Sequence, residues 1–279
     1  MSAVPFLDLG SPWGLGAGAT CLAVLVALLV DLRLGEPPAR WHPVVWMGKW
    51  LDVFGPLIAP LADPSPAGND RVSFWRGALA WCLGAMGVGT IALVLQWVML
   101  NWLHSALLGV LAGLLLKPLL AWRMLRDEVA AVEAALGESL QAGRDRLAWL
   151  CSRDVSALSA VEVRETALET LAENLNDSVV APLFWFVVGG LPAAALYRWA
   201  NTADAMWGYR GVRHGRVWTW AGKWAARADD VLSWLPARLT GVALMLAGRS
   251  HAWRYWAGQA GQTPSPNGGW PMADRKSVV

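Results

Sequence analysis

The feature that most constrains this chain is a set of long stretches without a formal charge. Residues 78–100 form a run of 23 residues that contains no Asp, Glu, Lys or Arg. A helix of about 20 apolar residues is long enough to cross the hydrocarbon core of a bilayer. Shorter or interrupted apolar stretches lie at 14–30, 103–122, 178–200 and 231–248. The sequence therefore predicts an all-α, polytopic membrane protein with about five apolar segments.

The composition agrees with a membrane location. Hydrophobic residues make up 56% of the 279 residues and charged residues 16%, against about 25% charged residues in soluble domains. The chain holds 20 Trp residues, a residue type that is enriched at bilayer interfaces. A net charge of +2 gives no electrostatic case for a nucleic-acid partner. Three Cys residues without metal-pair spacing are expected to be packed or free thiols.

The distribution of basic residues predicts the topology, because cytoplasmic loops carry an excess of Lys and Arg. Residues 31–77 hold five of these residues and the first 13 residues hold none. We therefore expect the N-terminus outside and residues 31–77 in the cytoplasm. A hairpin over 78–122 would return the chain to the cytoplasm. There, residues 123–177 alternate polar and apolar side chains at helical spacing, which predicts a helical cytoplasmic region.

The apolar stretch 178–200 is interrupted by Pro182, Gly189-Gly190 and Pro192. If this stretch crossed the membrane once, six basic residues between 198 and 227 would be external. We therefore predict a re-entrant or broken hairpin that returns to the cytoplasmic side. Non-helical backbone is tolerated at membrane depth where protein buries it.

An acidic stripe precedes this break. Glu165, Glu169, Glu173 and Asp177 recur every four residues, so a helix would place them on one face. The stripe is either a solvated helix face beside Arg164 or a site for a divalent cation or a cationic substrate. Mg²⁺ often uses only one or two carboxylates together with phosphate oxygens. The position of the stripe, directly before the membrane break, favours the second interpretation.

Other polar clusters follow the break, and each of them is either a site or an interface anchor. Adjacent Asp229 and Asp230 at a membrane entry are costly unless they are paired or bind a metal. Arg238 lies inside an apolar stretch, where it would pair with a carboxylate or bind phosphate or carboxylate in fork geometry. His42 stands in a Trp-His-Pro turn, where histidine is more often structural than catalytic. No Walker-type phosphate loop is present in the sequence.

At these clusters the chain resembles the adenosylcobinamide-phosphate synthase family of cobalamin biosynthesis, the CobD/CbiB membrane proteins. Six stretches between residues 31 and 273 match the family in order. Ser152 and Ser178 stand where family members usually have Gly. The matching stretches are 31–37 with 42–48, 152–154, 169–185, 201–209, 226–240 and 265–271.

The resemblance implies an enzyme, a C–N ligase. It would join the ring-D propionate carboxyl of adenosylcobyric acid to (R)-1-aminopropan-2-ol or its O-phosphate, with ATP and Mg²⁺ as implied cofactors. The resemblance also implies a location in the bacterial inner membrane with a cytoplasmic active site. The expected partners are the two substrates, the lipid bilayer and other membrane enzymes of the corrin pathway.

The resemblance also assigns roles to residues. The catalytic residues would be His42, as a general base toward the amine, with Glu173, Asp177 and Asp204. Mg²⁺ would be held by Glu173, Asp177, Asp229 and Asp230. Phosphate, corrin carboxylate and corrin amides would be bound by Arg153, Asn174, Asn201, Arg227, Arg238 and Asn267.

Two other classes of function stay open. Broken apolar segments with carboxylates at their ends are common in transporters, although five segments without repeat symmetry disfavour that class. Uptake of a labelled solute without ATP turnover would identify a transporter. A non-catalytic assembly partner would bind a corrinoid without ligating it.

The resemblance implies one integral-membrane domain over residues 1–273, with residues 123–177 as a cytoplasmic helical insertion. Family members normally continue for several tens of residues beyond the Ser-Pro-Asn motif, so we expect a C-terminal truncation. Residues 274–279 match a translation of sequencing-adapter DNA and are expected to be a non-native tail.

Overall fold

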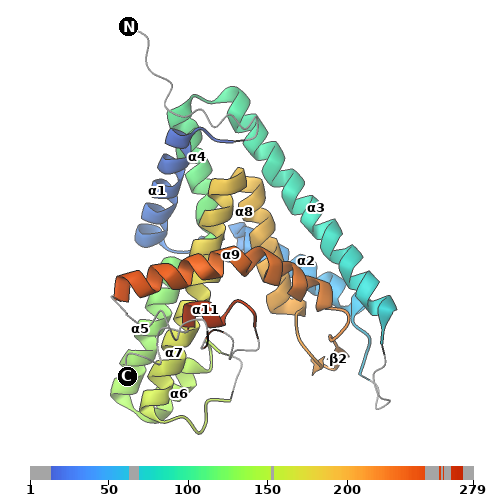
Figure 1. The fold of residues 1–279 in the computed structure, drawn as a ribbon, viewed down its shortest axis with the longest axis vertical. Coiled ribbons are helices and arrows are strands. Elements are labelled where there is room, and N and C mark those ends of the chain that lie inside the picture. Colours follow the sequence, from blue (N-terminus) through green and yellow to red (C-terminus); the bar gives the residue numbers. More distant parts are fainter. Residues whose placement is uncertain are drawn as a thin grey trace. The chain divides into compact units, whose positions relative to one another are not determined.

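The computed structural model describes residues 14–62, 69–151, 154–248, 258, 260 and 265–272. These residues are almost entirely helical, which confirms the predicted all-α class (Figure 1). Residues 274–279 lie outside the described residues, so the expected tail stays a prediction. The elements are α1 (Ala17–Leu34), η1 (Ala39–Trp41), α2 (Pro43–Ile58), α3 (Arg71–Trp102), α4 (Ser105–Leu116), η2 (Lys117–Leu119), α5 (Trp122–Glu138), α6 (Leu140–Leu147), α7 (Ala160–Leu175), η3 (Asn176–Val180), α8 (Ala181–Trp207), β1 (Val212–Arg213), β2 (Arg216–Val217), α9 (Lys223–Gly248) and α11 (Gly269–Met272).

Five helical segments are long and apolar enough to cross a membrane, as the sequence predicts. Each of them overlaps one of the five apolar stretches. The segments are Ala17–Leu34, Arg71–Trp102, Ser105–Glu138, Ala160–Trp207 and Lys223–Ala247.

The chain divides into two compact units. The first unit comprises Met1–Leu120 and Pro182–Leu232, and the second comprises Ala121–Ala181 and Ser233–Val279. The second unit includes the predicted insertion 123–177 and also the chain from Ser233 onward. The cytoplasmic location of that insertion stays a prediction.

In the first unit, α1 packs along α4 through small residues. Ala19, Ala23 and Ala27 of α1 are buried. A Cβ atom on Gly113 of α4 would lie 2.5 Å from the carbonyl oxygen of Ala23, so only glycine permits this approach. Close packing through small residues is the usual basis of helix association in membranes, where no hydrophobic force acts between helices.

The predicted break in α8 is present at Gly189 and Gly190. Gly190 has a φ of 67° and a ψ of −155°, outside the helical region, and Figure 1 shows the chain reversing direction there. The buried side chain of Gln96 on α3 satisfies the interrupted backbone, because its Oε1 accepts the N–H of Leu191 at 2.8 Å. Pro192 suits the first turn of the second helical arm, where its missing N–H has no intrahelical partner.

Two tryptophans of α8 lie in the core of the first unit. Trp199 and Trp207 are each 1% exposed. Their indole N–H groups donate to the carbonyls of Trp81 and Leu51, each at 3.2 Å. A Cβ atom on Gly84 would lie 2.1 Å from the Trp199 ring, so glycine is required there. These tryptophans are packing residues, unlike the interfacial ones that the composition suggests.

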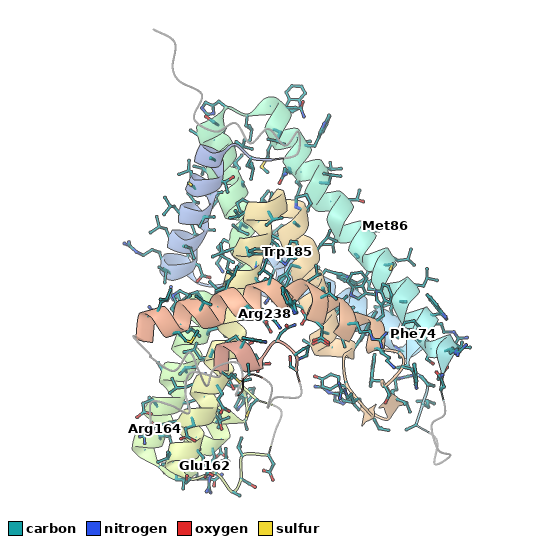
Figure 2. The ribbon with its side chains drawn as sticks, in the orientation of Figure 1. Phe74, Met86, Glu162, Arg164, Trp185 and Arg238 are labelled. Carbon is teal, nitrogen blue, oxygen red and sulfur yellow. The ribbon has the colours of Figure 1, made fainter. Side chains whose placement is uncertain are left out.

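A proline in α9 is compensated in a similar way. Pro236 lies inside α9 and has no N–H to donate to the carbonyl of Leu232, four residues earlier. The indole N–H of Trp185, labelled in Figure 2, donates to that carbonyl at 3.0 Å. The tryptophan therefore removes the cost of an unpaired carbonyl in an apolar setting.

A short β-hairpin follows α8. Its strands pair Val212 with Val217 and Arg213 with Arg216. The Arg216 guanidinium donates to the carbonyls of Pro56 and Ala59 at 3.1 and 2.7 Å, and so closes the C-terminal end of α2. At least one of the basic residues used in the topology argument therefore has a structural role.

The second unit contains a bundle of α5, α6 and α7. Its core includes the buried side chains of Val132, Leu147 and Val163. Helix α7 begins with a capping box between Ser159 and Glu162. Figure 2 labels Glu162 and Arg164 on this helix, and Arg164 forms an ion pair of 2.7 Å with Glu133 of α5.

Candidate functional site

The predicted site residues fall into two groups, one in each unit. Arg153 lies outside the described residues. The second unit holds Glu173, Asn174, Asp177, Arg238 and Asn267, and the first unit holds His42, Asn201, Asp204, Arg227, Asp229 and Asp230.

The acidic stripe of α7 becomes more buried toward its C-terminal end. Glu165 is exposed, whereas Glu169, Glu173 and Asp177 are half-buried. After Leu175, the α-helix passes into a π-helical turn over Asn176–Val180. Such single π turns inside helices occur frequently at functional sites. The C-terminal end of the stripe is therefore its most site-like part.

A buried amide orients Asp177. Asn176 is 2% exposed, and its Nδ2 donates to Oδ1 of Asp177 at 2.8 Å. Oδ1 of Asn176 lies 3.1 Å from the hydroxyl of Thr240 on α9, which is fully buried. The carboxylate is thus fixed by a side chain to which sequence reasoning gave no role. By contrast, Asn174 donates to the carbonyl of Thr170 at 2.9 Å, a bond within its own helix.

Arg238 is held on both faces of its guanidinium. The guanidinium carbon lies 4.1 Å from the ring centre of Trp234 and 4.5 Å from that of Trp270. Nη1 donates to the carbonyl of Trp234 at 2.5 Å and to Oδ1 of Asn267 at 3.3 Å. Figure 2 labels Arg238 on α9. No ion pair forms between Arg238 and a carboxylate of the described residues, and the Nε–Nη2 edge makes no hydrogen bond to them.

The loop before α11 connects Arg238 to Glu173. The hydroxyl of Ser265 accepts the N–H groups of Asn267 and Gly268 at 3.2 and 3.1 Å. Asn267 contacts Arg238, and a Cβ atom on Gly268 would lie 2.9 Å from Oε1 of Glu173. These contacts bring an arginine, an amide and the carboxylate of Glu173 together from three segments that are distant in sequence.

In the first unit, Asn201 links α8 to α9. Its Oδ1 accepts from Arg198 at 3.2 Å, and its Nδ2 donates to Asp229 at 3.4 Å. Asp204 lies against Gly208, whose N–H donates to the Asp204 carbonyl at 2.7 Å. Asp230 is half-buried, whereas the predicted phosphate ligand Arg227 is exposed.

The predicted metal ligands permit only an open site. Among the described residues, no three His, Cys, Asp or Glu side chains converge to hold a metal ion. Glu173 and Asp177 belong to the second unit, whereas Asp229 and Asp230 belong to the first. Glu173 and Asp177 are both half-buried, and their carboxylate oxygens are the type of ligand that Mg²⁺ takes together with water and phosphate oxygens. Neither pair supplies enough donors for a closed site.

His42 has both ring nitrogens engaged. Its Nδ1 accepts the N–H of Val44 at 3.3 Å, and its Nε2 lies 2.9 Å from Oε2 of Glu36. A neutral His42 in this arrangement carries its proton on Nε2 and donates it to Glu36. To act as a general base, it would have to release the long Nδ1 contact.

Behind His42 lies a buried ion cluster that sequence reasoning did not assign. Nζ of Lys117 lies 3.2 Å from Asp31 and 3.0 Å from Glu36, and the side chains of Lys117 and Asp31 are 5% and 0% exposed. Burial acts to raise the pKa of Glu36, but the hydrogen bonds from His42 and Lys117 and their charges outweigh it and lower that pKa. The signal available in the sequence was a lone lysine in an apolar run.

Comparisons with known proteins agree with the motifs. The family model described as CobD/Cbib protein matches residues 24–275. A probable cobalamin biosynthesis protein CobD of Methanothermobacter thermautotrophicus is 36% identical over 256 residues, which cover 90% of this chain and 79% of the relative. Proteins named cobalamin biosynthesis protein CobD from Chromobacterium violaceum and Stutzerimonas stutzeri are 39% and 41% identical. Their matches cover 91% and 90% of this chain and 78% of each relative. No solved structure matches.

Proposed function

The chain belongs to the CobD/Cbib protein family of cobalamin biosynthesis, and on this premise we propose that it is an adenosylcobinamide-phosphate synthase. It would join adenosylcobyric acid to (R)-1-aminopropan-2-ol or its O-phosphate through an amide bond, with ATP as the source of free energy.

The observation that carries the proposal is the arrangement of Arg238 in the second unit. The two indoles and the two acceptors of Nη1 fix the plane of its guanidinium. The Nε–Nη2 edge presents two parallel donors, which match a carboxylate or a phosphate. Activation of a substrate carboxylate requires a cationic group that binds the anion and protein carboxylates that hold Mg²⁺. Arg238 is such a cation, and Glu173 and Asp177 of the same unit are such carboxylates.

The proposed reaction has two steps. A corrin carboxylate oxygen attacks the γ-phosphorus of ATP, which gives an acyl phosphate and ADP. The free amine then attacks the acyl carbon, its nitrogen loses a proton, and inorganic phosphate leaves. In this proposal Arg238 holds the carboxylate or the transferred phosphoryl group, and Asn267 keeps Arg238 in place. Mg²⁺, when bound by Glu173 and Asp177, would supply charge neutralisation for the phosphates.

Residues of the first unit also receive roles from the family resemblance. Asp204, Asp229 and Asp230 would attract the ammonium form of the amine, and Asn201 would hydrogen-bond a corrin amide. Arg227 is exposed and would reach a phosphate from solvent. His42 would take the proton of the amine only after its Nδ1 contact to Val44 opens. We further propose a bacterial inner-membrane location with these groups on the cytoplasmic side, near other enzymes of the corrin pathway.

Substitution of Asp177 by Asn tests the proposal. Asn is isosteric and still offers Oδ1 to the Nδ2 donor of Asn176, so the fold should be retained. We expect formation of cobinamide phosphate by the purified protein to fall by about 10²-fold or more, the usual cost of removing one preorganised electrostatic group. Glu165→Gln, at the exposed start of the same stripe, is the matched control and should retain activity.

Two results would contradict this assignment. Unchanged product formation in Asp177→Asn would show that Asp177 has no role in the reaction. A wild-type protein that binds a corrinoid and never ligates it, in the presence of ATP, Mg²⁺ and either amine, would identify an assembly partner. ATP-independent uptake by proteoliposomes would identify a transporter.

A further inference from the structure

The first unit contains a pocket that the proposed reaction does not use. Its volume is about 480 Å³ and it is lined by residues of α2, α3, α4, η2 and α8, together with Trp41 of η1. This volume lies within the range of about 300–1,000 Å³ that is usual for small-ligand sites. Every residue that the structure places in its wall is apolar.

The pocket has a buried floor and an exposed mouth. Leu191, Leu119 and Trp199 line the floor and are at most 4% exposed. Ile91 and Trp46 line the mouth and are 64% and 50% exposed. Ile91 lies in the middle of α3, a helix long and apolar enough to cross the membrane. If α3 crosses the bilayer, the side of the mouth formed by Ile91 would face hydrocarbon and not water.

The wall offers few hydrogen-bonding groups to a ligand, and two of its four indole N–H groups are engaged within the protein. The indole N–H of Trp46 donates to the carbonyl of Arg40 at 3.0 Å, and that of Trp199 donates to Trp81. A polar molecule such as an amide-bearing corrin would leave its own polar groups unpaired in this pocket. A methylene group is similar in size to a water molecule, which occupies about 30 Å³. The pocket therefore has room for on the order of sixteen methylene groups, the length of one acyl chain.

A cation stands beside the mouth. Arg40 directly precedes Trp41, and its backbone carbonyl accepts from Trp46, so two residues of the pocket wall flank it. Its side chain is exposed and forms no ion pair with the described residues. An arginine next to a hydrocarbon-facing pocket is complementary to a molecule with an apolar chain and an anionic head group.

We propose that this pocket binds one acyl chain of an anionic phospholipid, with the phosphate at Arg40. The lipid would complete the packing between α2, α3 and the second arm of α8 from the bilayer side. This inference concerns a lipid site and does not depend on the proposed ligase activity.

The test blocks the pocket from within. Gly87 lies in the wall, and a Cβ atom there would meet no atom within 4 Å, so a larger side chain enters open space. Gly87→Leu should fill part of the pocket without unfolding the protein. Gly18→Leu, at an exposed glycine of α1 with equally open space, is the matched control.

The full chain is purified in a mild detergent from vesicles of phosphatidylglycerol and phosphatidylcholine, and native mass spectrometry counts the lipid that is retained. We expect one phosphatidylglycerol per chain in the wild type and in Gly18→Leu. Retention by Gly87→Leu should fall by about tenfold or more, which corresponds to about 1.4 kcal/mol.

A second variant tests the head group. Arg40→Gln should still retain a lipid but lose the preference for phosphatidylglycerol over phosphatidylcholine by about fivefold, the usual effect of one arginine near a membrane surface. Equal retention by wild type and Gly87→Leu would overturn the pocket assignment. An unchanged preference in Arg40→Gln would overturn the head-group assignment.

Discussion

Lys117 and Arg238 are both cations inside apolar helical segments, but the two units treat them differently. Lys117 in the first unit lies between the carboxylates of Asp31 and Glu36 and is almost fully buried. Arg238 in the second unit lies between two indoles, with its Nη1 bound by two uncharged acceptors. The first cation is neutralised within its own cluster, whereas the second keeps its charge and one donor edge.

The difference separates a structural cation from a binding cation. A buried ion pair gains little net stability, but removing one partner leaves an uncompensated charge and is strongly destabilising. A cation held by aromatic faces is positioned without being neutralised, so its charge can act on a ligand. Stability measurements should therefore respond to Lys117, and activity measurements to Arg238.

The largest expected effect is that of Lys117→Met. Loss of the ammonium leaves Asp31 and Glu36 facing each other in an apolar setting, which should lower the free energy of unfolding by about 3–5 kcal/mol. Chemical denaturation in lipid nanodiscs measures this change. The double variant Asp31→Asn, Lys117→Met should recover part of the loss. A single variant as stable as the wild type would show that the cluster is not a buried ion pair.

Arg238→Lys should produce the opposite pattern. Lysine keeps the charge but lacks the planar fork, so cobinamide phosphate formation should fall by about 10²-fold, a usual cost of losing one preorganised donor. The midpoint of unfolding should change little, because a cation–π contact contributes only about 0.5–2 kcal/mol. A large loss of stability with unchanged activity would place Arg238 in the same class as Lys117.

Trp270→Ala tests whether both indoles beside Arg238, those of Trp234 and Trp270, are needed to position its guanidinium. Removing one of the two rings leaves Arg238 held by Trp234 and by the two acceptors of Nη1. We expect a decrease in product formation of about two- to fivefold, since one cation–π contact contributes about 0.5–1 kcal/mol at a partly exposed site. Trp102→Ala, at an exposed tryptophan of α3, is a suitable control. Equal effects of the two substitutions on product formation would show that Trp270 does not position Arg238.

The smallest effect is a pH dependence of stability from Glu36. Its pKa is lowered below the usual 4.5, so the native state favours the carboxylate. The stabilisation is complete above about pH 4.5 and is lost as the pH falls through the lower native pKa. Unfolding curves of the wild type and Glu36→Gln should therefore differ less at low pH than at neutral pH. A difference in the free energy of unfolding that grows as the pH falls would contradict a lowered pKa of Glu36 in the native state.

Most of the fold could be predicted from the sequence. The five apolar stretches all coincide with helical segments, and the break at Gly189-Gly190 lies where the glycines and Pro192 indicate. The partner of that break, Gln96, was not found. Gln96 is uncharged, so a search for charge-free runs passes over it, and its contact to Leu191 spans 95 residues.

The sites were harder to predict because their contacts join distant segments. The sequence left open whether Arg238 pairs with a carboxylate or binds an anion, and the structure provides indoles, which no spacing rule indicates. Asn176 stands next to Asp177 in sequence, yet its burial against Thr240 depends on packing that the sequence does not show. Glu173 and Asp177 were recognised because their spacing is a property of one helix.

The contact between Gln96 and Leu191 also sets an order for biosynthesis. The acceptor belongs to α3, and the backbone that it satisfies is synthesised 95 residues later. At about 5–20 residues per second, α3 waits on the order of 5–20 seconds in the membrane before the second arm of α8 exists. During that interval the Oε1 atom of Gln96 cannot accept the N–H of Leu191. The nascent chain therefore passes through a period in which its third helix is inserted but not yet committed to its final neighbours.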